Sequence, residues 1–305
     1  MIKDLTGVLP ALISPLRADG TVDEPAVSRL VEHVISGGVT GMLALGSTGE
    51  TASLDEKARR TLLSSVVAAA AGRVPVICGV AQSHLAAARG EVEAAARLGA
   101  AAALVAPPSY YPMDQATVLA FYRQLAKGSP LPILLYNIPR RTGVGFTVAM
   151  VERLADDPKV VGIKESSKDW GLLSSVIRRT RDRISVFAGY ASFFGLAALC
   201  EGAVGYIDSG TPVFGAKSLA FHKAATTGDL DTARRLQSDM EHMLTAYFGL
   251  GTFPASIKAA LDLLGRPGGP TRDPIRPLDP AQREVLRKTM VAAGLIAEQA
   301  RAGAA

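Results

Sequence analysis

The amino-acid sequence predicts an α/β fold, a (β/α)8 TIM barrel followed by a C-terminal helical extension. Three observations support this prediction: short apolar segments alternate with helical patterns, there are eight such segments, and only helical patterns follow the eighth. The chain has 305 residues, 48% of them hydrophobic, which is enough to bury a large core. Strands that are apolar on both faces are typical of parallel sheets covered by helices. An open doubly wound sheet shows the same alternation, and periodicity alone does not exclude it.

The predicted elements follow one another in order along the first two thirds of the chain. Asp23 and Pro25 begin the first helix, whose apolar residues recur at a 3.6-residue period. Ser53 and Glu56 form a capping-box pattern that predicts the start of the second helix. We expect strands at 8–13, 41–45, 74–80, 102–106, 133–136, 160–164, 184–187 and 203–207, with helices from 23, from 53 to about 71, from about 83 to 99 and around 118–125.

Helical patterns alone fill the remainder of the chain. We expect these helices at 229–248, 256–264 and from 280 to about 299, with four prolines between the last two. The sequence therefore predicts a barrel at 1–225 and a C-terminal helical extension at 226–305 that packs on the barrel.

Charge and cysteine content argue against several classes of protein. The formal net charge is +5, and the most basic stretch, 178–183, contains Asp182 and no aromatic residue, as is typical of a solvated helix end rather than a nucleic-acid-binding surface. Cys78 and Cys200 lie far apart in apolar surroundings, so we expect core thiols in a reducing compartment. No apolar run is long enough for a membrane span, and the first residues lack a signal-peptide pattern. We expect a cytoplasmic protein with no nucleic-acid or membrane partner.

Polar residues follow several predicted strands at their carboxyl ends. G-S-T-G-E occupies 46–50, P-P-S-Y-Y occupies 107–111, Y-N-I-P-R-R-T-G occupies 136–143, and Lys164 ends the sixth strand. In a (β/α)8 barrel these ends share one rim, where the βα loops converge and active sites lie. We therefore expect the functional site at this rim.

Lys164 ends an otherwise apolar strand, V-V-G-I-K, and is a candidate nucleophile. Burial disfavours the charged amine and lowers its pKa, and a neutral lysine attacks a carbonyl carbon to form a Schiff base. Taken alone, Lys164 fits a solvated or ion-paired lysine better. Tyr136 changes this balance, because a phenol one strand earlier can move the protons that imine formation and hydrolysis require.

The glycine-rich turn at 46–49 is a candidate anion site. Its backbone N–H groups and the hydroxyls of Ser47 and Thr48 can surround a small carboxylate, although an ordinary tight turn before a helix fits the same residues. The turn lacks the spacing of a phosphate loop, so it does not indicate nucleotide binding. The four histidines show no metal-ligand spacing, and we expect neither a metal nor a cofactor.

Together these motifs resemble the dihydrodipicolinate synthase and N-acetylneuraminate lyase family of pyruvate-dependent class I aldolases, with dihydrodipicolinate synthase the closest match. G-S-T-G-E, Y-N-I-P-x-R-T-G and G-I-K-E occur in the family's order and at its spacing, and the resemblance extends from Gly7 to the final helix. The motifs are specific for the family and much less so for the substrate. The resemblance implies a lyase whose partners are pyruvate and a small aldehyde or 2-oxo acid.

The resemblance also implies a role for each matching residue. Lys164 would form the Schiff base with pyruvate, and Tyr136 would be its acid/base partner. Ser47 would pass protons between Tyr136 and Tyr110. Tyr110 would reach into the site of a neighbouring subunit, which implies a homo-oligomer built as a dimer of dimers; aromatic packing in a proline-rich loop is the alternative. The implied substrate-binding residues are Thr48, Arg141, Gly189 and Ile207.

The acceptor aldehyde is the least determined part of this prediction. Arg141 matches the position that holds the carboxylate of aspartate semialdehyde in synthases, which favours 4-hydroxy-tetrahydrodipicolinate synthase of lysine biosynthesis; a surface arginine is the alternative. Ser47, Asp208 and the loop around Tyr110 depart from the synthase pattern, and a carboxylate at position 208 near the rim could reject an anionic substrate or bind a hydroxylated one. They keep open an aldolase or dehydratase for a 2-keto-3-deoxy sugar acid or N-acetylneuraminate.

Two further expectations concern inhibition by lysine and the alternative of a non-catalytic binding protein. Ser109 before Tyr110 and the turn at 79–84 depart from the residues that contribute to lysine inhibition in regulated members, so we expect weak or absent lysine feedback. A barrel that binds 2-oxo acids without turnover is disfavoured, because a binding protein has little need for the full set of Lys164, Tyr136, Ser47 and Tyr110.

Overall fold

Eight short parallel strands form one sheet in the computed structural model, which describes residues 5–297 apart from the side chains of residues 244 and 245. From β2 to β8 each strand pairs with the next, β1 pairs with β8, and a bridge between Ala11 and Leu43 joins β1 to β2. The sheet therefore closes into a barrel, as predicted. The strands are β1 (Gly7–Pro10), β2 (Met42–Ala44), β3 (Val76–Val80), β4 (Ala102–Val105), β5 (Ile133–Asn137), β6 (Val160–Glu165), β7 (Ser185–Ala188) and β8 (Gly205–Asp208).

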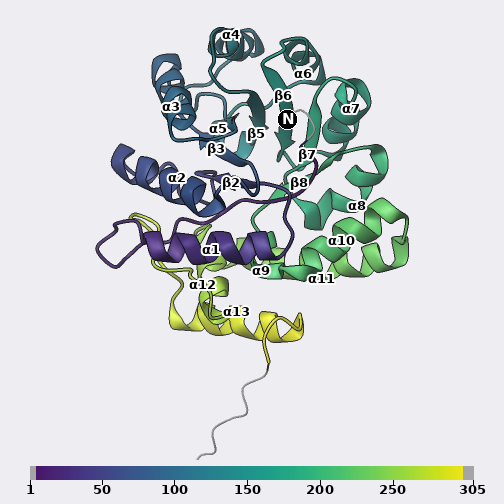
Figure 1. The fold of residues 1–305 in the computed structure, drawn as a ribbon. Coiled ribbons are helices and arrows are strands. Elements are labelled where there is room, and N and C mark those ends of the chain that lie inside the picture. The colour runs from purple at the N-terminus through teal and green to yellow at the C-terminus, as the bar shows by residue number, and fades with distance from the viewer. Residues whose placement is uncertain (1–4, 298–305) are drawn as a thin grey trace, which may run out of the picture.

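Helices follow the strands and surround the barrel (Figure 1). The alternation of strands and helices predicted from the sequence is confirmed, and the short segments α5 and α9 follow β5 and β8 directly. The helices of the barrel are α1 (Glu24–Ser36), α2 (Glu56–Ala70), α3 (Leu85–Arg97), α4 (Gln115–Ala126), α5 (Pro139–Thr142), α6 (Val148–Ala155), α7 (Trp170–Thr180), α8 (Ala191–Glu201), α9 (Thr211–Phe214) and α10 (Ala216–Thr227).

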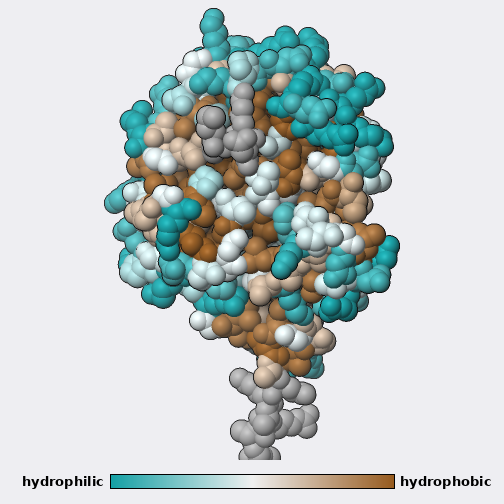
Figure 2. Space-filling model, turned by 45° about the vertical axis from the view of Figure 1, so that its right-hand side comes forward, coloured by the Kyte–Doolittle hydropathy of each residue, from teal (hydrophilic) through white to brown (hydrophobic). Residues whose placement is uncertain are grey.

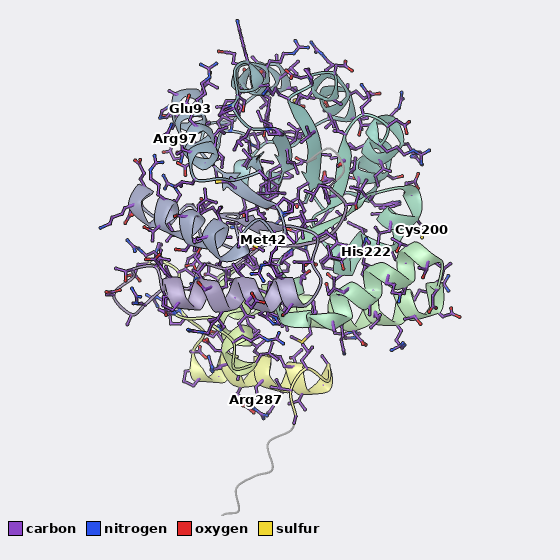
Figure 3. All side chains as sticks on the ribbon, viewed as in Figure 1. Met42, Glu93, Arg97, Cys200, His222 and Arg287 are labelled. Atoms are coloured by element: carbon purple, nitrogen blue, oxygen red, sulfur yellow. The ribbon has the colours of Figure 1, made fainter. Side chains whose placement is uncertain are left out.

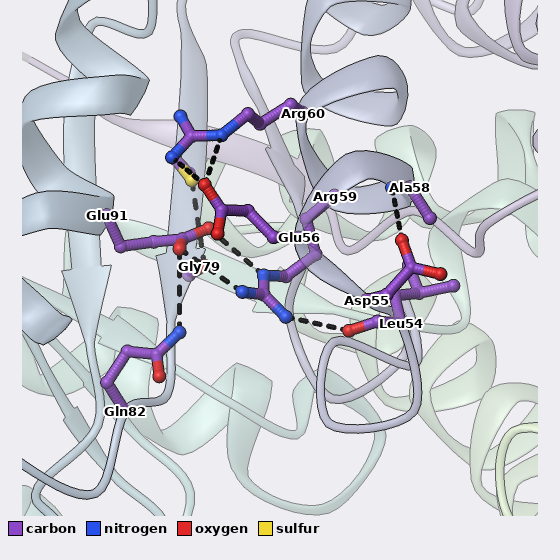
Figure 4. Close-up of polar contacts among 10 residues, drawn as sticks. Leu54, Asp55, Glu56, Ala58, Arg59, Arg60, Gly79, Gln82 and Glu91 are labelled. Atoms are coloured by element: carbon purple, nitrogen blue, oxygen red, sulfur yellow. Dashed lines mark hydrogen bonds and ion pairs between the residues drawn. The ribbon is translucent and has the colours of Figure 1, made fainter.

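The first helix begins where the sequence predicts, and the second does not. Asp23 caps α1 by accepting a hydrogen bond from the backbone N–H of Ala26. The predicted capping box of Ser53 and Glu56 is wrong: Asp55 caps α2 and accepts a 2.8 Å hydrogen bond from the backbone N–H of Ala58 (Figure 4). A charged carboxylate interacts more favourably than a serine hydroxyl with the positive end of the helix dipole, so the helix begins at the aspartate.

Two apolar layers hold the barrel together. Residues that alternate along the strands, among them Leu9, Leu104, Phe187 and Ile207, fill the barrel interior. The intervening strand residues pack outward against the helices in a second and larger cluster. Because both faces of every strand are buried, the strands are mainly apolar, as the sequence indicates. The ionisable side chains of Lys164 and Glu165 at the end of β6 and of Asp208 at the end of β8 are therefore exceptions.

Three helices follow the barrel: α11 (Leu230–Gly249), α12 (Ala255–Leu263) and α13 (Pro280–Ala292). Helix α11 packs against α8 and α10, α12 contacts α9, and α13 packs against α11 and α12 at the edge of the molecule (Figure 1). Helix α13 ends at Ala292, before Gly294 with its φ of 63°, so the predicted continuation of this helix is wrong for residues 293–297, and the predicted end near residue 299 lies outside the described residues. The division of the chain at residue 225 stays a prediction.

Hydrophilic side chains cover much of the outer surface in the view of Figure 2, and apolar side chains show between them. Of the two cysteines, Cys78 is buried as predicted, but Cys200 is exposed near the end of α8, so its prediction as a core thiol is wrong (Figure 3). His222 lies on the neighbouring helix α10. Among the described residues, none of the helices combines the length and apolar character needed to cross a membrane.

Candidate active site

Lys164 and Tyr136 lie side by side at the carboxyl ends of β6 and β5. The two residues are partners in the parallel register of these strands. Lys164 Nζ lies 4.8 Å from the centroid of the Tyr136 ring. The structure therefore brings together the candidate nucleophile and the candidate acid/base group that the sequence identifies.

Burial lowers the pKa of Lys164 to about 7, with a smaller contribution in the same direction from the positive charge of Arg141. The negative charge of Asp208 acts in the opposite direction and raises this pKa. Lys164 is only 5% exposed, so its amine loses most of its hydration in the charged form. At neutral pH a substantial fraction of the amine is thus unprotonated and nucleophilic.

Burial raises the pKa of the Tyr136 phenol above its usual value. The hydroxyl of Ser47, the charge of Arg141 and the hydroxyl of Ser166 oppose this rise, in decreasing order. Tyr136 therefore keeps its proton at neutral pH and has hydroxyl groups beside it. An arrangement of this kind can donate a proton to an oxygen atom bound near Lys164 and recover it through the neighbouring hydroxyls.

The turn at 46–50 is held in an unusual conformation beside Tyr136. Leu45, just before the turn, and Glu50, its last residue, have φ angles of 59° and 55°, in the left-handed region. Ser14 fixes its far side by donating a 2.6 Å hydrogen bond to the carbonyl of Gly49. On the neighbouring strand only glycine fits at position 79, because a Cβ there would lie 2.3 Å from the carbonyl oxygen of Leu45.

A buried ion pair joins this turn to the C-terminal helices. Lys258 Nζ on α12 lies 2.5 Å from Glu50 Oε1, and both side chains are almost fully buried. Lys258 also donates to the carbonyl of Pro270, and the backbone N–H of Arg272 donates to Glu50 Oε2 at 2.8 Å. These contacts explain the final glutamate of the G-S-T-G-E motif, which has a positioning role rather than a place beside Lys164.

Glu165 supports the loop that carries Arg141. Its carboxylate accepts a 2.6 Å hydrogen bond from Asn137 Nδ2 and a further bond from the backbone N–H of Ser167. Asn137 Oδ1 in turn accepts from the backbone N–H of Phe146, beyond the loop. Burial raises the pKa of Glu165, although these hydrogen bonds oppose the rise. The side chain after the candidate nucleophile therefore fixes the backbone around it.

Two cavities that share several lining residues lie at this rim. The smaller, here the catalytic cavity, has a volume of about 30 Å³, and the larger, here the outer cavity, has about 380 Å³. The catalytic cavity is lined by Ser47, Thr48, Tyr136, Ile138, Arg141, Lys164, Ser166, Gly189, Tyr190, Ser209, Phe248 and Phe253. Ser47, Tyr136 and Arg141 also line the outer cavity, so a molecule bound there lies next to the candidate catalytic groups.

The structure places most of the predicted site residues around the catalytic cavity. Gly189 lines it, and a Cβ at this position would lie 1.8 Å from Ser166 Oγ, so only glycine fits. Ile207 is fully buried in the barrel interior and does not line the cavity. Tyr110 lies away from it, 87% exposed, with its ring edge-on to that of Tyr111. Tyr110 therefore contacts neither Tyr136 nor Ser47 within this chain.

Asp208 is turned away from the cavities. Its carboxylate accepts hydrogen bonds from the backbone N–H groups of Gly210 and Thr211 and from the Thr211 hydroxyl. Burial raises the pKa of Asp208, and those hydrogen bonds together with the charge of Lys164 oppose the rise. Asp208 is thus placed to influence Lys164 electrostatically rather than to contact a substrate. Among residues 5–297, no group of three His, Cys, Asp or Glu side chains is arranged to hold a metal ion.

Sequence reasoning missed several residues of the site. Tyr190, Phe248 and Phe253 line the catalytic cavity, and Arg140 lines the outer one. They come from the loop after β7, the end of α11, the loop between α11 and α12 and the short helix α5, so no single motif contains all of them. The available signal was the pair of phenylalanines in F-G-L-G-T-F-P, a segment whose glycines and proline mark it as a loop between two helices.

Comparison with known proteins agrees with this site. The model of the dihydrodipicolinate synthetase family matches residues 4–293. The 4-hydroxy-tetrahydrodipicolinate synthase of Phenylobacterium zucineum is 37% identical over 295 residues, 95% of this chain and 98% of that protein. The N-acetylneuraminate lyase of Rhizobium meliloti is 35% identical over 288 residues, 94% of each chain.

Solved structures show the same fold. The dihydrodipicolinate synthase of Thermotoga maritima superposes with a TM-score of 0.91 at 29% identity, over 96% of this chain and 99% of that one. A prophage protein of the dihydrodipicolinic acid synthase family from E. coli K12, crystallised with pyruvate, also has a TM-score of 0.91, at 28% identity over 95% and 99% of the two chains. The chain belongs to the dihydrodipicolinate synthetase family and is a lyase of the class I aldolase type.

Proposed function

We propose that this protein forms a Schiff base between Lys164 and pyruvate and uses it to make or break a carbon–carbon bond at the pyruvate methyl group. The observation that carries the proposal is the buried amine of Lys164, with its pKa of about 7, beside the Tyr136 ring. The related E. coli protein crystallised with pyruvate supports the choice of ligand.

Each residue around the catalytic cavity has a part in this chemistry. Lys164 attacks the ketone carbon of pyruvate, and Tyr136 donates a proton to the oxygen that leaves as water. The hydroxyls of Ser47 and Thr48 and the backbone of the turn hold the pyruvate carboxylate. Gly189 leaves room for the pyruvate, whereas Ile207 is buried in the barrel interior and lines neither cavity. The protonated imine then accepts the electrons left when a methyl proton departs, which gives an enamine.

Aspartate semialdehyde is the first acceptor that we propose, as in 4-hydroxy-tetrahydrodipicolinate synthase of lysine biosynthesis. Arg141 supports this acceptor because it lines both cavities and offers a guanidinium fork to a carboxylate. Synthases of this name are 37% and 35% identical to the chain.

Cleavage of a sugar-derived 2-oxo acid is the second candidate function. The N-acetylneuraminate lyase of Rhizobium meliloti, 35% identical, favours it. The contribution expected from Asp208 does not, because this carboxylate is turned toward Thr211 and lines neither cavity. Retro-aldol release of pyruvate from N-acetylneuraminate measures this activity directly.

A second copy of the chain completes the site in this proposal. Tyr110 and Tyr111 are 87% and 70% exposed and project from the loop after β4. Two large exposed aromatic side chains side by side are typical of a surface that associates with another protein. Insertion of Tyr110 into the partner's site would place it beside Ser47 and Tyr136, within a homo-oligomer built as a dimer of dimers.

Borohydride reduction in the presence of pyruvate tests the central step. Wild type is expected to gain the reduced pyruvate adduct by mass spectrometry, and Lys164→Ala is expected to gain none. Lys159→Ala is the matched control, because Lys159 is exposed at the opposite end of the same strand. A coupled assay of wild type with aspartate semialdehyde then tests the acceptor. If wild type forms no adduct where a known class I aldolase does, the Schiff-base proposal is overturned and the alternative of a barrel that binds 2-oxo acids without turnover is favoured.

A further inference from the structure

Lys168 lies in the loop between β6 and α7, and its backbone has an unusual conformation. Its φ of 68° is in the left-handed region. Glycine adopts this region freely, whereas a residue with a Cβ atom adopts it at a cost in free energy. A lysine here therefore strains the loop, and contacts of its side chain must offset that strain. The strand that this loop follows, β6, carries Lys164 near its end.

Three aromatic rings lie around the amine of Lys168. Its Nζ atom lies over the ring faces, 4.5 Å from the centroid of Phe193 and 5.1 Å from those of Tyr190 and Phe248. These three rings are here called the ring cage. Burial lowers the pKa of Lys168, with a smaller contribution from the charge of Arg140, and among the described residues no carboxylate forms an ion pair with this amine. The attraction between the cation and the ring faces is thus the contact that offsets the strain.

The ring cage joins segments that are far apart in the sequence. Tyr190 directly precedes α8, Phe193 lies in the first turn of that helix, and Phe248 lies near the end of α11. The ring of Tyr190 meets those of Phe193 and Phe248 edge-on, with centroids 6.1 Å and 6.0 Å apart. Lys168 adds a cation from a third segment, so its contacts tie α11 to the loop that follows β6.

Two rings of the cage also belong to the catalytic cavity. Tyr190 and Phe248 line it, whereas Phe193 does not. Lys168 is not part of the lining either, so its amine contacts the two rings from outside the cavity. Phe248 also stacks on Phe253, another lining residue, with centroids 5.3 Å apart. With these rings in place the cavity has a volume of only about 30 Å³. A movement of Phe248 would thus open the space around the candidate nucleophile to solvent.

We propose that Lys168 is a positioning residue whose ammonium group holds Tyr190 and Phe248 in place and so keeps water away from the imine at Lys164. The inference rests on the pyruvate Schiff base proposed above. Water that reaches the enamine gives a proton to its carbon atom, which forms the new C–H bond with the enamine electron pair. Water then adds to the resulting imine and releases pyruvate, with the amine of Lys164 restored and no carbon–carbon bond formed. A closed wall suppresses this unproductive return.

Reduction of the pyruvate imine by cyanoborohydride measures how easily a small molecule from solvent reaches it. The rate is followed by mass spectrometry of the protein at saturating pyruvate. Lys168→Met keeps a long side chain and the strained backbone but removes the cation, and it is expected to raise the reduction rate about fivefold. Lys168→Arg restores a cation over the rings and should be reduced at the wild-type rate. A general loss of stability would not make this reaction faster.

Further variants separate the positions of the rings from stability and from charge. Lys168→Gly removes the backbone strain together with the cation, so the melting temperature should not fall although the reduction rate rises. Phe193→Leu weakens the cage without changing a charge or a residue of the cavity lining, and it should raise the rate about two- to threefold. Lys159→Met, at an exposed lysine just before β6, is the matched control and should leave the rate unchanged.

Hydrogen exchange of the backbone amides at 246–251 gives a second readout that needs no pyruvate. Exchange there should be faster in Lys168→Met than in wild type and in Lys168→Arg. Unchanged hydrogen exchange, an unchanged reduction rate in Lys168→Met, or no increase in Phe193→Leu would each overturn the inference while the proposed function stands. If wild type forms no reduced adduct, the proposed function fails, and the exclusion of water from the imine fails with it.

Discussion

The two ends of the site are built in different ways. The end proposed to bind pyruvate, here the pyruvate end, is formed by Lys164, Tyr136 and the turn at 46–50 and uses the ends of strands whose register the barrel fixes. The end proposed to bind the acceptor, here the acceptor end, is formed by Tyr190, Phe248, Phe253, Arg140 and Arg141 and uses loops, the short helix α5 and the end of α11. Rigid strands suit a reaction step shared by many substrates, and loops suit the part that distinguishes them. Variants at the pyruvate end should therefore affect the reaction with every acceptor, whereas variants at the acceptor end should affect different acceptors unequally.

Tyr136→Phe is expected to give the largest effect. The change keeps the ring beside Lys164 but removes the phenol proton, so kcat should fall by about 10²–10⁴-fold with every acceptor. Steady-state kinetics with two acceptors measures this loss. Tyr122→Phe is the matched control, because its hydroxyl donates to the carbonyl of Val105, outside both cavities. A loss of kcat with only one of the two acceptors would contradict the assignment of Tyr136 to a step that all acceptors share.

Lys258→Met should be next in size, through stability. It leaves Glu50 charged and buried without its partner, which is expected to lower the free energy of unfolding by about 3–5 kcal/mol. Urea unfolding followed by circular dichroism measures the change. The double variant Glu50→Gln, Lys258→Met removes both charges and should recover most of the loss. Equal destabilisation of the single and double variants would show that the pair does not hold the pyruvate turn.

Gly189→Ala tests how tightly the pyruvate end is packed. The added methyl group would lie 1.8 Å from Ser166 Oγ and 2.7 Å from the carbonyl oxygen of Glu165, so we expect about 1–3 kcal/mol of destabilisation and slower pyruvate trapping. Gly90→Ala, in the exposed face of α3 with no atom near the new methyl group, is the control and should not destabilise the protein. Normal trapping by Gly189→Ala would contradict this packing.

The shift that Asp208→Asn causes in the pH dependence of pyruvate trapping is expected to be the smallest of these effects. Because the pKa of Lys164 is about 7, the trapping rate should fall about tenfold per pH unit below pH 7 and level off above it. Asp208 raises the pKa of Lys164, so Asp208→Asn should move the midpoint to lower pH. Rates measured with saturating borohydride across this range provide the test. A midpoint that stays in place would show that Asp208 does not act on the amine.

The same contrast explains what the sequence could predict. Lys164 and Tyr136 end predicted strands within continuous motifs, so the barrel and the pyruvate end followed from local patterns. Phe248, which stacks on Phe253, meets Tyr190 only after the C-terminal helices pack on the barrel, and such a long-range contact leaves no local pattern. The start of α2 was misplaced because two capping residues lie two positions apart, and the charge of Asp55 decides between them.

Peptide mapping of the borohydride-reduced protein tests the central claim most directly. Trypsin cleaves after Lys159, Lys164 and Lys168 in the unmodified chain, but the carboxyethyl group that reduction of the pyruvate imine leaves on Lys164 blocks the middle cleavage. The account predicts that pyruvate and borohydride together produce a single longer peptide, 160–168, that carries the reduced adduct on Lys164. An adduct on another lysine, or complete cleavage after Lys164 in protein that has gained the adduct mass, would contradict the assignment of Lys164 as the nucleophile.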